Sequence, residues 1–334
     1  MIKRVLYLSY YIRKLNRKMF KSFSAHVKKE NSISSLSLYS DILRSSLKYN
    51  ISILEYFQFH FINLNDKERN TFAGTGFMYE YQLLMNPKST RFVLENKLIF
   101  LEKYGKFIKH KFCSLSNIEK NPDAANEVLK NKSGKIVLKS SDGQCGIGIE
   151  VRNTNEFTPE KLRQRLIETG NNMVEEFVVQ HDDIMKISPS GLNTIRIITQ
   201  LNSKDEVEIL GARFRISVNS SVDNLAAGNI AAPIDENTGV VNGPGVYSDI
   251  TKPDEIVHPI TKEKILGFKI PFWSETLNLV KEAALSNKTN RSIGWDLAIT
   301  NDGPDIIEGN HDWCKLLWQL PVKKGLKHDL EKYL

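Results

Sequence analysis

The chain has 334 residues, 41% of them hydrophobic and 25% charged, a composition typical of a globular protein with room for about two domains. Its net charge is +7, but residues 1–30 carry nine Lys and Arg against one acid, Glu30, and so hold +8, which leaves −1 for the remainder. The nearly neutral body argues against nucleic-acid binding, and no apolar run approaches the ~18 residues of a membrane span.

The basic N-terminal segment also contains Leu, Tyr and Phe side chains. The simpler interpretation is a solvated first helix packed on the body. The alternative is contact with the inner face of an anionic membrane, to which basic amphipathic segments bind. Both interpretations fit a soluble, cytoplasmic protein. The few cysteines, which form no Cys-x-x-Cys pair, favour a reducing compartment and argue against a zinc site: Cys113, Cys145 and Cys314.

The chain divides into a helical part and a part dominated by short β-type runs. Residues 1–95 read as mostly helical, with helices expected over 35–49 and 67–84, and another over 93–104. Thr158-Pro159 opens a further helix that stops near Gly170. The other expected elements are strands 136–139, 147–152, 173–179, 193–201 and 207–217, helix 271–286, and a closing hairpin of 293–300 and 305–310.

We therefore expect an α+β fold with antiparallel sheets and a helical N-terminal extension. The expected domains are a basic helical region, 1–95, a lobe with a glycine-rich loop, 96–178, and a C-terminal lobe, 179–334.

The closing hairpin carries the most informative side chains. A three-residue loop, Asn301-Asp302-Gly303, pairs Thr300 with Pro304, and hence Ala298 with Ile306 and Asp296 with Glu308. Directly opposed residues share one face of a sheet, with Cβ atoms ~5 Å apart.

Asn310 lies two residues beyond Glu308 and so shares its face. Two carboxylates, Asp296 and Glu308, and an amide oxygen thus converge between apolar strand residues. Like charges opposed this closely favour a bound cation, and such oxygen ligands suit Mg²⁺. A solvated hairpin with chance acids is the alternative, which the apolar strands make less attractive.

The loop after Lys139 is rich in glycine. Gly143, Gly146 and Gly148 allow backbone N–H groups to approach phosphate oxygens, and Lys139 supplies a positive charge there. The loop is neither a Walker A motif nor a dinucleotide fingerprint. A plain hairpin loop would have a similar sequence.

Two further segments contain polar side chains on expected strands. Glu175-Glu176-Phe177-Val178 suits a linker that reads adenine through its backbone, although it also suits an ordinary strand. Arg196, Arg213 and Arg215 carry planar forks that fit phosphate or carboxylate, although a surface row of cations is the alternative.

The order of these four elements resembles the ATP-grasp superfamily, and residues from about Asn96 to Trp313 resemble its sugar-transfer-associated family. The matching stretches are Leu192-Asn193-Thr194-Ile195-Arg196, Ala227-Gly228-Asn229-Ile230, Ile234-Asp235, Thr238-Gly239, His258-Pro259, Ile270-Pro271-Phe272-Trp273, Gly294-Trp295-Asp296 and Glu308-Gly309-Asn310.

The resemblance implies an ATP-grasp fold, in which two α+β lobes enclose ATP, and it implies roles for individual residues. Lys97 and Lys139, with the loop glycines Gly143 and Gly146, would hold the phosphates, residues Glu175, Glu176, Phe177 and Val178 the adenine, and Asp183 the ribose. Arg196 would face the γ-phosphate, Asp296, Glu308 and Asn310 would bind Mg²⁺, and Arg213, Arg215 and Asn229 would bind substrate.

The expected function is that of an ATP-dependent carboxylate–amine ligase that works through an acyl phosphate. The resemblance suggests an amino acid or amine joined to a sugar acid in surface polysaccharide biosynthesis. Two alternatives stay open: a kinase that phosphorylates a sugar or glycan hydroxyl, and a nucleotide-binding partner protein without catalysis.

Overall fold

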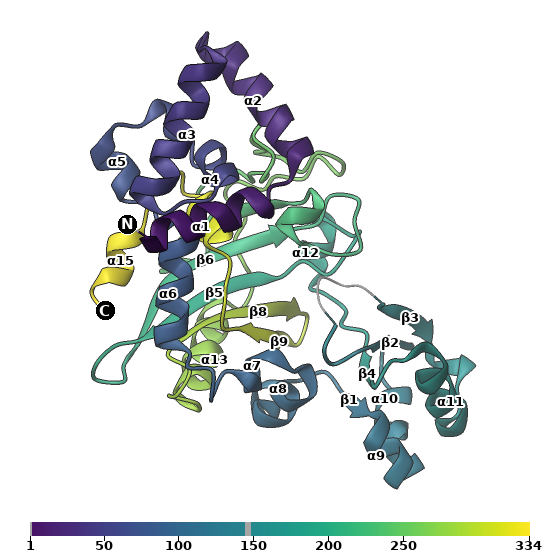
Figure 1. Ribbon diagram of the computed structural model, residues 1–334. Coiled ribbons are helices and arrows are strands. Elements are labelled where there is room, and N and C mark those ends of the chain that lie inside the picture. Colours follow the sequence, from purple (N-terminus) through teal and green to yellow (C-terminus); the bar gives the residue numbers. More distant parts are fainter. Residues whose placement is uncertain (1, 144–147) are drawn as a thin grey trace.

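The computed structural model describes residues 2–143 and 148–334. Figure 1 shows a helical region at one end, a large sheet at the centre and a smaller sheet with its own helices to the side. Both sheets are antiparallel, so the expected α+β class with a helical N-terminal region is confirmed. No helix of the described residues is long and apolar enough to cross a bilayer.

The N-terminal region is a set of helices with an aromatic core. Polar N-caps start several of them; the Ser34 and Ser52 side chains accept hydrogen bonds from the first turns that follow. Val246 and Leu320 join this core, so the region packs on distant parts of the chain. Its helices are α1 (Ile2–Arg13), α2 (Arg17–Asn31), α3 (Ser35–Tyr49), α4 (Ile53–Gln58), α5 (Asp66–Asn70) and α6 (Thr75–Met85).

Two of the expected helices are each divided in the structure. The run 67–84 is broken between α5 and α6, where Gly74 lies so close to Ile51 that a Cβ would be 2.6 Å from its Cγ2. The run 93–104 is broken at Asn96, whose side chain caps α8 by accepting a hydrogen bond from the N–H of Ile99. Close approach and capping therefore override the helical periodicity at these points.

The smaller sheet has the strand order β1-β4-β2-β3. Helices α9 (Leu115–Lys120), α10 (Asn126–Leu129) and α11 (Pro159–Thr169) cover the face that carries its apolar core. The expected caps of α11 are confirmed: Thr158 accepts from the N–H of Lys161, and Gly170 has φ +70°. The strands are β1 (Phe112–Ser114), β2 (Lys135–Lys139), β3 (Glu150–Asn153) and β4 (Met173–Glu176).

The large sheet has the order β7-β6-β5-β8-β9, and its core is the largest apolar cluster of the molecule. Helix α13 (Trp273–Leu285) packs on it. Phe100 and Leu101 of α8 belong to this core, although the predicted boundary at residue 96 groups them with the smaller lobe. The strands are β5 (Ile195–Leu201), β6 (Val207–Ile216), β7 (Ile230–Ile234), β8 (Ser292–Thr300) and β9 (Gly303–Asn310).

Short helices complete the fold. The α-helices are α7 (Phe92–Glu95), α8 (Lys97–Lys103), α12 (Asp182–Ile187), α14 (Lys315–Gln319) and α15 (Lys327–Glu331), and the 3₁₀ helices are Phe61–Asn63, Gly105–Phe107, Pro122–Ala125, Thr154–Glu156 and Leu225–Ala227.

The closing hairpin differs from its expected register at the tip but agrees at the acids. Thr300 pairs with Gly303 rather than Pro304, so the loop has two residues instead of three. An irregularity next to Asp296 places one extra residue on β9, and Asp296 again opposes Glu308. A shorter loop and a bulge thus cancel, and the predicted pairing of the two acids is confirmed.

Candidate functional site

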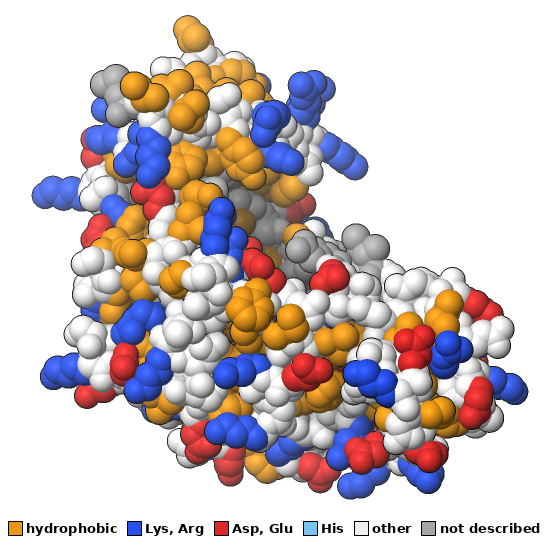
Figure 2. Space-filling view, turned by 60° about the horizontal axis from the view of Figure 1, so that its bottom comes forward, with side chains coloured by type: hydrophobic (Ala, Val, Ile, Leu, Met, Phe, Trp, Pro, Cys, Tyr) orange, Lys and Arg blue, Asp and Glu red, His pale blue; other side chains and the backbone are white. Residues whose placement is uncertain are grey.

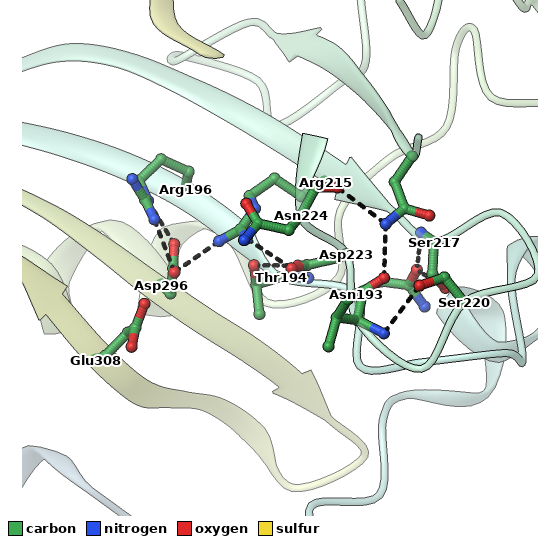
Figure 3. Close-up of polar contacts among 12 residues, drawn as sticks. Asn193, Thr194, Arg196, Arg215, Ser217, Ser220, Asp223, Asn224, Asp296 and Glu308 are labelled. Atoms are coloured by element: carbon green, nitrogen blue, oxygen red, sulfur yellow. Dashed lines mark hydrogen bonds and ion pairs between the residues drawn. The ribbon is translucent and has the colours of Figure 1, made fainter. Parts of the chain in front are cut away.

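Three charged side chains form a row across the large sheet. Glu308 on β9 opposes Asp296 on β8, and Asp296 opposes Arg196 on β5. The Arg196 guanidinium donates two hydrogen bonds to the Asp296 carboxylate, from Nε to Oδ1 and from Nη2 to Oδ2 at 2.8 Å (Figure 3). This two-point contact fixes both side chains, because the planar fork of arginine matches the carboxylate.

Arg215 on β6 connects this row to a second buried acid. Its Nη1 lies 2.6 Å from Asp296 Oδ2, and its Nη2 lies 2.7 Å from Asp223 Oδ1 (Figure 3). Thr194 donates to Asp223 through its backbone N–H at 2.8 Å and its hydroxyl at 2.5 Å. Two arginines and two acids therefore form a continuous network. Asp223 was missed from the sequence because it lies in a loop without a motif.

The electrostatics of the two opposed acids differ. Burial acts to raise the pKa of Asp296, but Arg196 and Arg215 outweigh it and hold that pKa well below the ordinary value. Burial raises the pKa of Glu308, and the nearby charge of Asp296 raises it further. Asp296 is therefore stabilised in its ionised form, whereas Glu308 binds a proton more readily than an isolated glutamate does, and a cation between them would compete with that proton.

The oxygens of Asp296, Glu308 and Asn310 are of the kind that magnesium prefers, although in this structure both Asp296 oxygens accept hydrogen bonds from Arg196 and Arg215. Two carboxylates lie beside Asn310, whose Nδ2 is 3.2 Å from Glu308 Oε1 and 3.3 Å from the Gly294 carbonyl. Hard oxygen ligands from one or two carboxylates, completed by water and phosphate, are the set that Mg²⁺ prefers. The described residues contain no group of three or more His, Cys, Asp or Glu placed to hold a metal. Any ion here would thus depend on the Asp–Glu–Asn set.

The two lysines implied in phosphate binding lie near this row. Lys139 Nζ is 2.5 Å from Glu175 Oε2, and Lys97 donates to the carbonyl of Gly143 in the glycine-rich loop. Burial lowers the pKa of Lys97, while the charges of Glu308 and Glu175 oppose this effect. Lys97 therefore lies close to Glu308 of the row and to Glu175 of the expected hinge. Gly146 lies outside the described residues.

The expected adenine hinge overlaps the end of β4, an interior strand of the smaller sheet, and continues beyond it. The backbone N–H of Glu176 donates to Lys111 O at 2.7 Å, and that of Phe177 donates to Lys135 O at 3.1 Å. These donors are engaged by the lobe itself, and Val178 is the next residue of the hinge. The start of the segment is thus held by its hydrogen bonds to the smaller lobe.

Asn193 ties the end of the hinge to the large sheet. Its side chain donates to Gln180 Oε1 at 3.1 Å and accepts from the Ser217 N–H at 2.7 Å. It is fully buried, and Figure 3 shows it beside the network of Arg215 and Asp223. The asparagine of the Asn-Thr-x-Arg stretch thus supports the start of β5, from which Arg196 projects.

Three further predicted residues lie outside the central row. The Arg213 guanidinium donates to the carbonyls of Trp318 and Ala212, and burial lowers its pKa to about 10. The Asn229 side chain accepts a hydrogen bond from the Val218 N–H and donates to the carbonyls of Val222 and Asn224. Asp183 is exposed on α12, where it pairs with Lys186 at 2.7 Å.

His181 and Asp183 border a cavity of about 710 Å³. The cavity also reaches Phe272 and Glu275 at the start of α13. Asp183 therefore faces an open, polar space rather than the acids of the row.

One family model matches most of the chain. The family model described as sugar-transfer associated ATP-grasp matches residues 77–333. No curated protein matches the chain.

Several solved structures are similar at low identity. The biotin carboxylase domain of 2-oxoglutarate carboxylase from Hydrogenobacter thermophilus, in complex with MgADP, is 16% identical with TM-score 0.40, over 75% of this chain and 52% of that one. An L-amino acid ligase from Bacillus licheniformis is 13% identical with TM-score 0.39, and the match covers 70% of this chain and 48% of that one. D-alanyl-alanine synthetase A from Vibrio cholerae is 12% identical with TM-score 0.40, and the match covers 71% of this chain and 60% of that one. The chain thus spans about half the length of these proteins.

Proposed function

Because the chain belongs to the sugar-transfer associated ATP-grasp family, we propose that it is an ATP-dependent carboxylate–amine ligase. The observation that carries the proposal is the row of buried Arg196, buried Asp296 and partly buried Glu308, with Lys97 beside it. This row combines fixed positive charge with a metal-type acid pair, which is what phosphoryl transfer requires.

We assign the nucleotide to the space between the two sheets. In this proposal Lys97 and Lys139 hold the phosphates, and the segment Glu175–Val178 contacts the adenine. Lys139 would leave Glu175 for the phosphates, since an ammonium beside phosphate gains more than one beside a single carboxylate. Asp183 remains the candidate for the ribose.

Asp296, Glu308 and Asn310 would hold magnesium, which when bound neutralises charge on the phosphate oxygens. Arg196 is held by Asp296 in an orientation fixed before substrate arrives. A guanidinium so placed stabilises negative charge on the transferred phosphoryl group without the cost of reorganisation. Arg196 is therefore the proposed catalytic arginine.

The proposed reaction has two steps. A carboxylate oxygen of the acceptor attacks the γ-phosphorus of ATP, the bond to the β–γ bridging oxygen breaks, and ADP leaves. An amine nitrogen then attacks the carbonyl carbon of the acyl phosphate, the bond to phosphate breaks, and the nitrogen releases a proton. No nucleophile of the protein takes part, and positioning and charge supply the catalysis.

The substrates are proposed from the family description alone: a sugar acid as the carboxylate and an amino acid or other amine as its partner, in polysaccharide biosynthesis. Arg215 is the candidate contact for the substrate carboxylate. We place the reaction in the cytoplasm, where ATP is available, and at or near the inner face of the membrane.

The test is product analysis of ATP turnover with uronic acids and amino acids. The proposal expects ADP and phosphate to form only when both carboxylate and amine are present. Glu308→Gln should lower kcat at least ~10²-fold, while the exposed Glu282→Gln should not change it. AMP as product would overturn the proposal, a stable phosphorylated sugar without amine would identify a kinase, and an unchanged rate in Glu308→Gln would indicate a binding role.

A further inference from the structure

Helix α1 carries an apolar face that no other part of the described chain covers. Ile2, Val5 and Leu6 are 80%, 53% and 65% exposed, and they recur at the spacing of one helix face. The opposite face is different, since Tyr7 and Tyr11 pack into the aromatic core of the N-terminal helices. The exposed face of α1 is therefore not needed to hold the helix in place.

Helix α3 carries a second apolar face. Leu36, Leu43 and Leu47 are 83%, 44% and 39% exposed, whereas Leu38 and Ile42 between them are buried. These exposed leucines repeat at intervals of seven and four residues and so run along one side of the helix.

The two helices contact each other. The Arg4 side chain of α1 donates to the carbonyls of Leu47 and Lys48, at 3.3 and 3.1 Å, so the first turn of α1 lies against the end of α3. Figure 2 shows hydrophobic side chains gathered over the N-terminal helices, with Lys and Arg at the border. We call this the α1–α3 surface, defined by Ile2, Val5, Leu6, Tyr10, Leu36, Leu43 and Leu47.

The charges around the α1–α3 surface are mainly positive. Exposed lysines and arginines are frequent in this part of the chain: Lys3 and Arg13 on α1, Lys14 just after it, Arg17, Lys18 and Lys21 on α2, and Arg44 and Lys48 on α3. Two of these cations pair with acids of the same region, Lys3 with Glu80 at 2.8 Å and Lys48 with Asp66 at 2.5 Å, and Asp41 is engaged by Arg69 at 2.8 Å. The surface thus offers apolar side chains inside a basic border.

We propose that the α1–α3 surface binds an anionic lipid bilayer. Exposed leucines and an isoleucine would enter the boundary between headgroups and acyl chains, and the basic border would contact negative headgroups. A protein partner of ordinary charge would leave the cations unmatched, whereas an anionic bilayer matches both features. The surface lies on the helical region, away from the smaller sheet, so the lobes remain free while it is bound (Figure 1).

The inference does not depend on the proposed ligase chemistry, because lipid binding is measured without nucleotide or substrate. Failure of one proposal therefore leaves the other intact. The α1–α3 surface is also larger than the basic N-terminal segment, since the exposed leucines of α3 lie outside residues 1–30.

The experiment is co-sedimentation of the full chain with vesicles of phosphatidylcholine alone and with vesicles that also contain phosphatidylglycerol. We expect binding only to the anionic vesicles, and weaker binding as salt is raised. The double variant Leu6→Ser with Leu36→Ser should lower the bound fraction about tenfold. Lys14→Glu with Lys18→Glu should do the same at low salt.

The matched control is Ile167→Ser with Leu285→Ser, two exposed apolar residues on other parts of the molecule. All variants should keep the wild-type Tm, because the substituted side chains are exposed. The proposal is overturned if the wild type binds neither vesicle, if it binds both equally, or if the Leu6/Leu36 variant binds like the control. Self-association that only this variant loses, without vesicle binding, would assign the surface to a second copy of the chain.

Discussion

Arg196 can lie along the large sheet because Gly294, two residues before Asp296 on β8, has no side chain. A Cβ on Gly294 would lie 3.2 Å from Arg196 Cδ and 2.6 Å from Trp313 Cβ. Glycine at this position therefore admits both the arginine and the tryptophan. The Gly-Trp-Asp stretch thus serves the site twice, since Asp296 receives the guanidinium that Gly294 accommodates.

His110 is a second buried residue that no motif revealed. Its Nδ1 is 2.7 Å from Asp305 Oδ2, and Asp305 also accepts the backbone N–H groups of Lys109 and His110 at 2.8 and 3.1 Å. Burial acts to lower the pKa of His110, but Asp305 outweighs it and raises that pKa above the ordinary value. The folded state therefore favours the imidazolium form.

Asp305→Asn should remove this stabilisation. Because the pKa of His110 is raised on folding, its contribution is complete below the unfolded value of about 6.5 and is lost as the pH rises through the folded value. We expect the variant to lose about 1–3 kcal/mol of unfolding free energy at pH 6 and less at alkaline pH. Urea unfolding across this range measures the difference. The exposed Asp302→Asn is the control, and a gap that stayed constant with pH would contradict the assignment.

At the scale of elements, helix α8 and the glycine-rich loop are joined through one asparagine. The Asn96 side chain caps α8 and donates to Asp142 Oδ1 at 2.8 Å and to Ser141 Oγ at 3.2 Å. The N–H of Lys97 also donates to the Ser141 carbonyl at 3.1 Å. The start of α8, and with it Lys97, is therefore positioned by the loop that follows β2.

Asn96→Ala should weaken nucleotide binding as well as the helix. Loss of the cap costs about 1 kcal/mol, and release of Lys97 should raise KM for ATP several-fold. Thr158→Ala is a matched control, because it removes the cap of α11, which holds no proposed ligand. Both variants should lower Tm similarly, and only Asn96→Ala should change KM. Equal KM values would show that the loop does not position Lys97.

At the scale of the whole molecule, the N-terminal helices are fastened to the C-terminal part of the chain by a buried ion pair. Lys315 Nζ on α14 lies 2.9 Å from Glu55 Oε1 on α4, and Glu55 is 1% exposed. The Thr75 side chain and backbone also donate to Glu55, at 2.7 and 3.0 Å. The helical region is thus part of the same folded unit as the sheet.

Lys315→Met should lower the free energy of unfolding by about 3–5 kcal/mol, because it leaves the Glu55 carboxylate buried without its cation. Lys288→Met removes an exposed partner of Asp205 and should cost less than about 1 kcal/mol. Denaturant unfolding followed by tryptophan fluorescence compares the two. Similar losses would show that the pair is not what fastens the helical region.

The sequence by itself determined the local features of this protein. Thr158-Pro159 and Gly170 predicted the ends of α11, because caps act within one turn of the chain. The hairpin also predicted that Asp296 and Glu308 are paired, although the folded chain reaches that pairing through a shorter loop and a bulge that the alternation does not indicate. The order of the motifs along the sequence also indicated the family.

The tertiary structure decided whatever depends on contacts between distant segments. Arg213 and Arg215 are two residues apart on β6, and alternation assigns them to the same face. Arg215 nevertheless contacts Asp296, whereas Arg213 donates to the Trp318 carbonyl. Asp223 enters the network from a loop, and α1 meets the end of α3 through Arg4 only after folding. Periodicity assigns a side chain to a face, but the partner that it meets there is supplied by the rest of the chain.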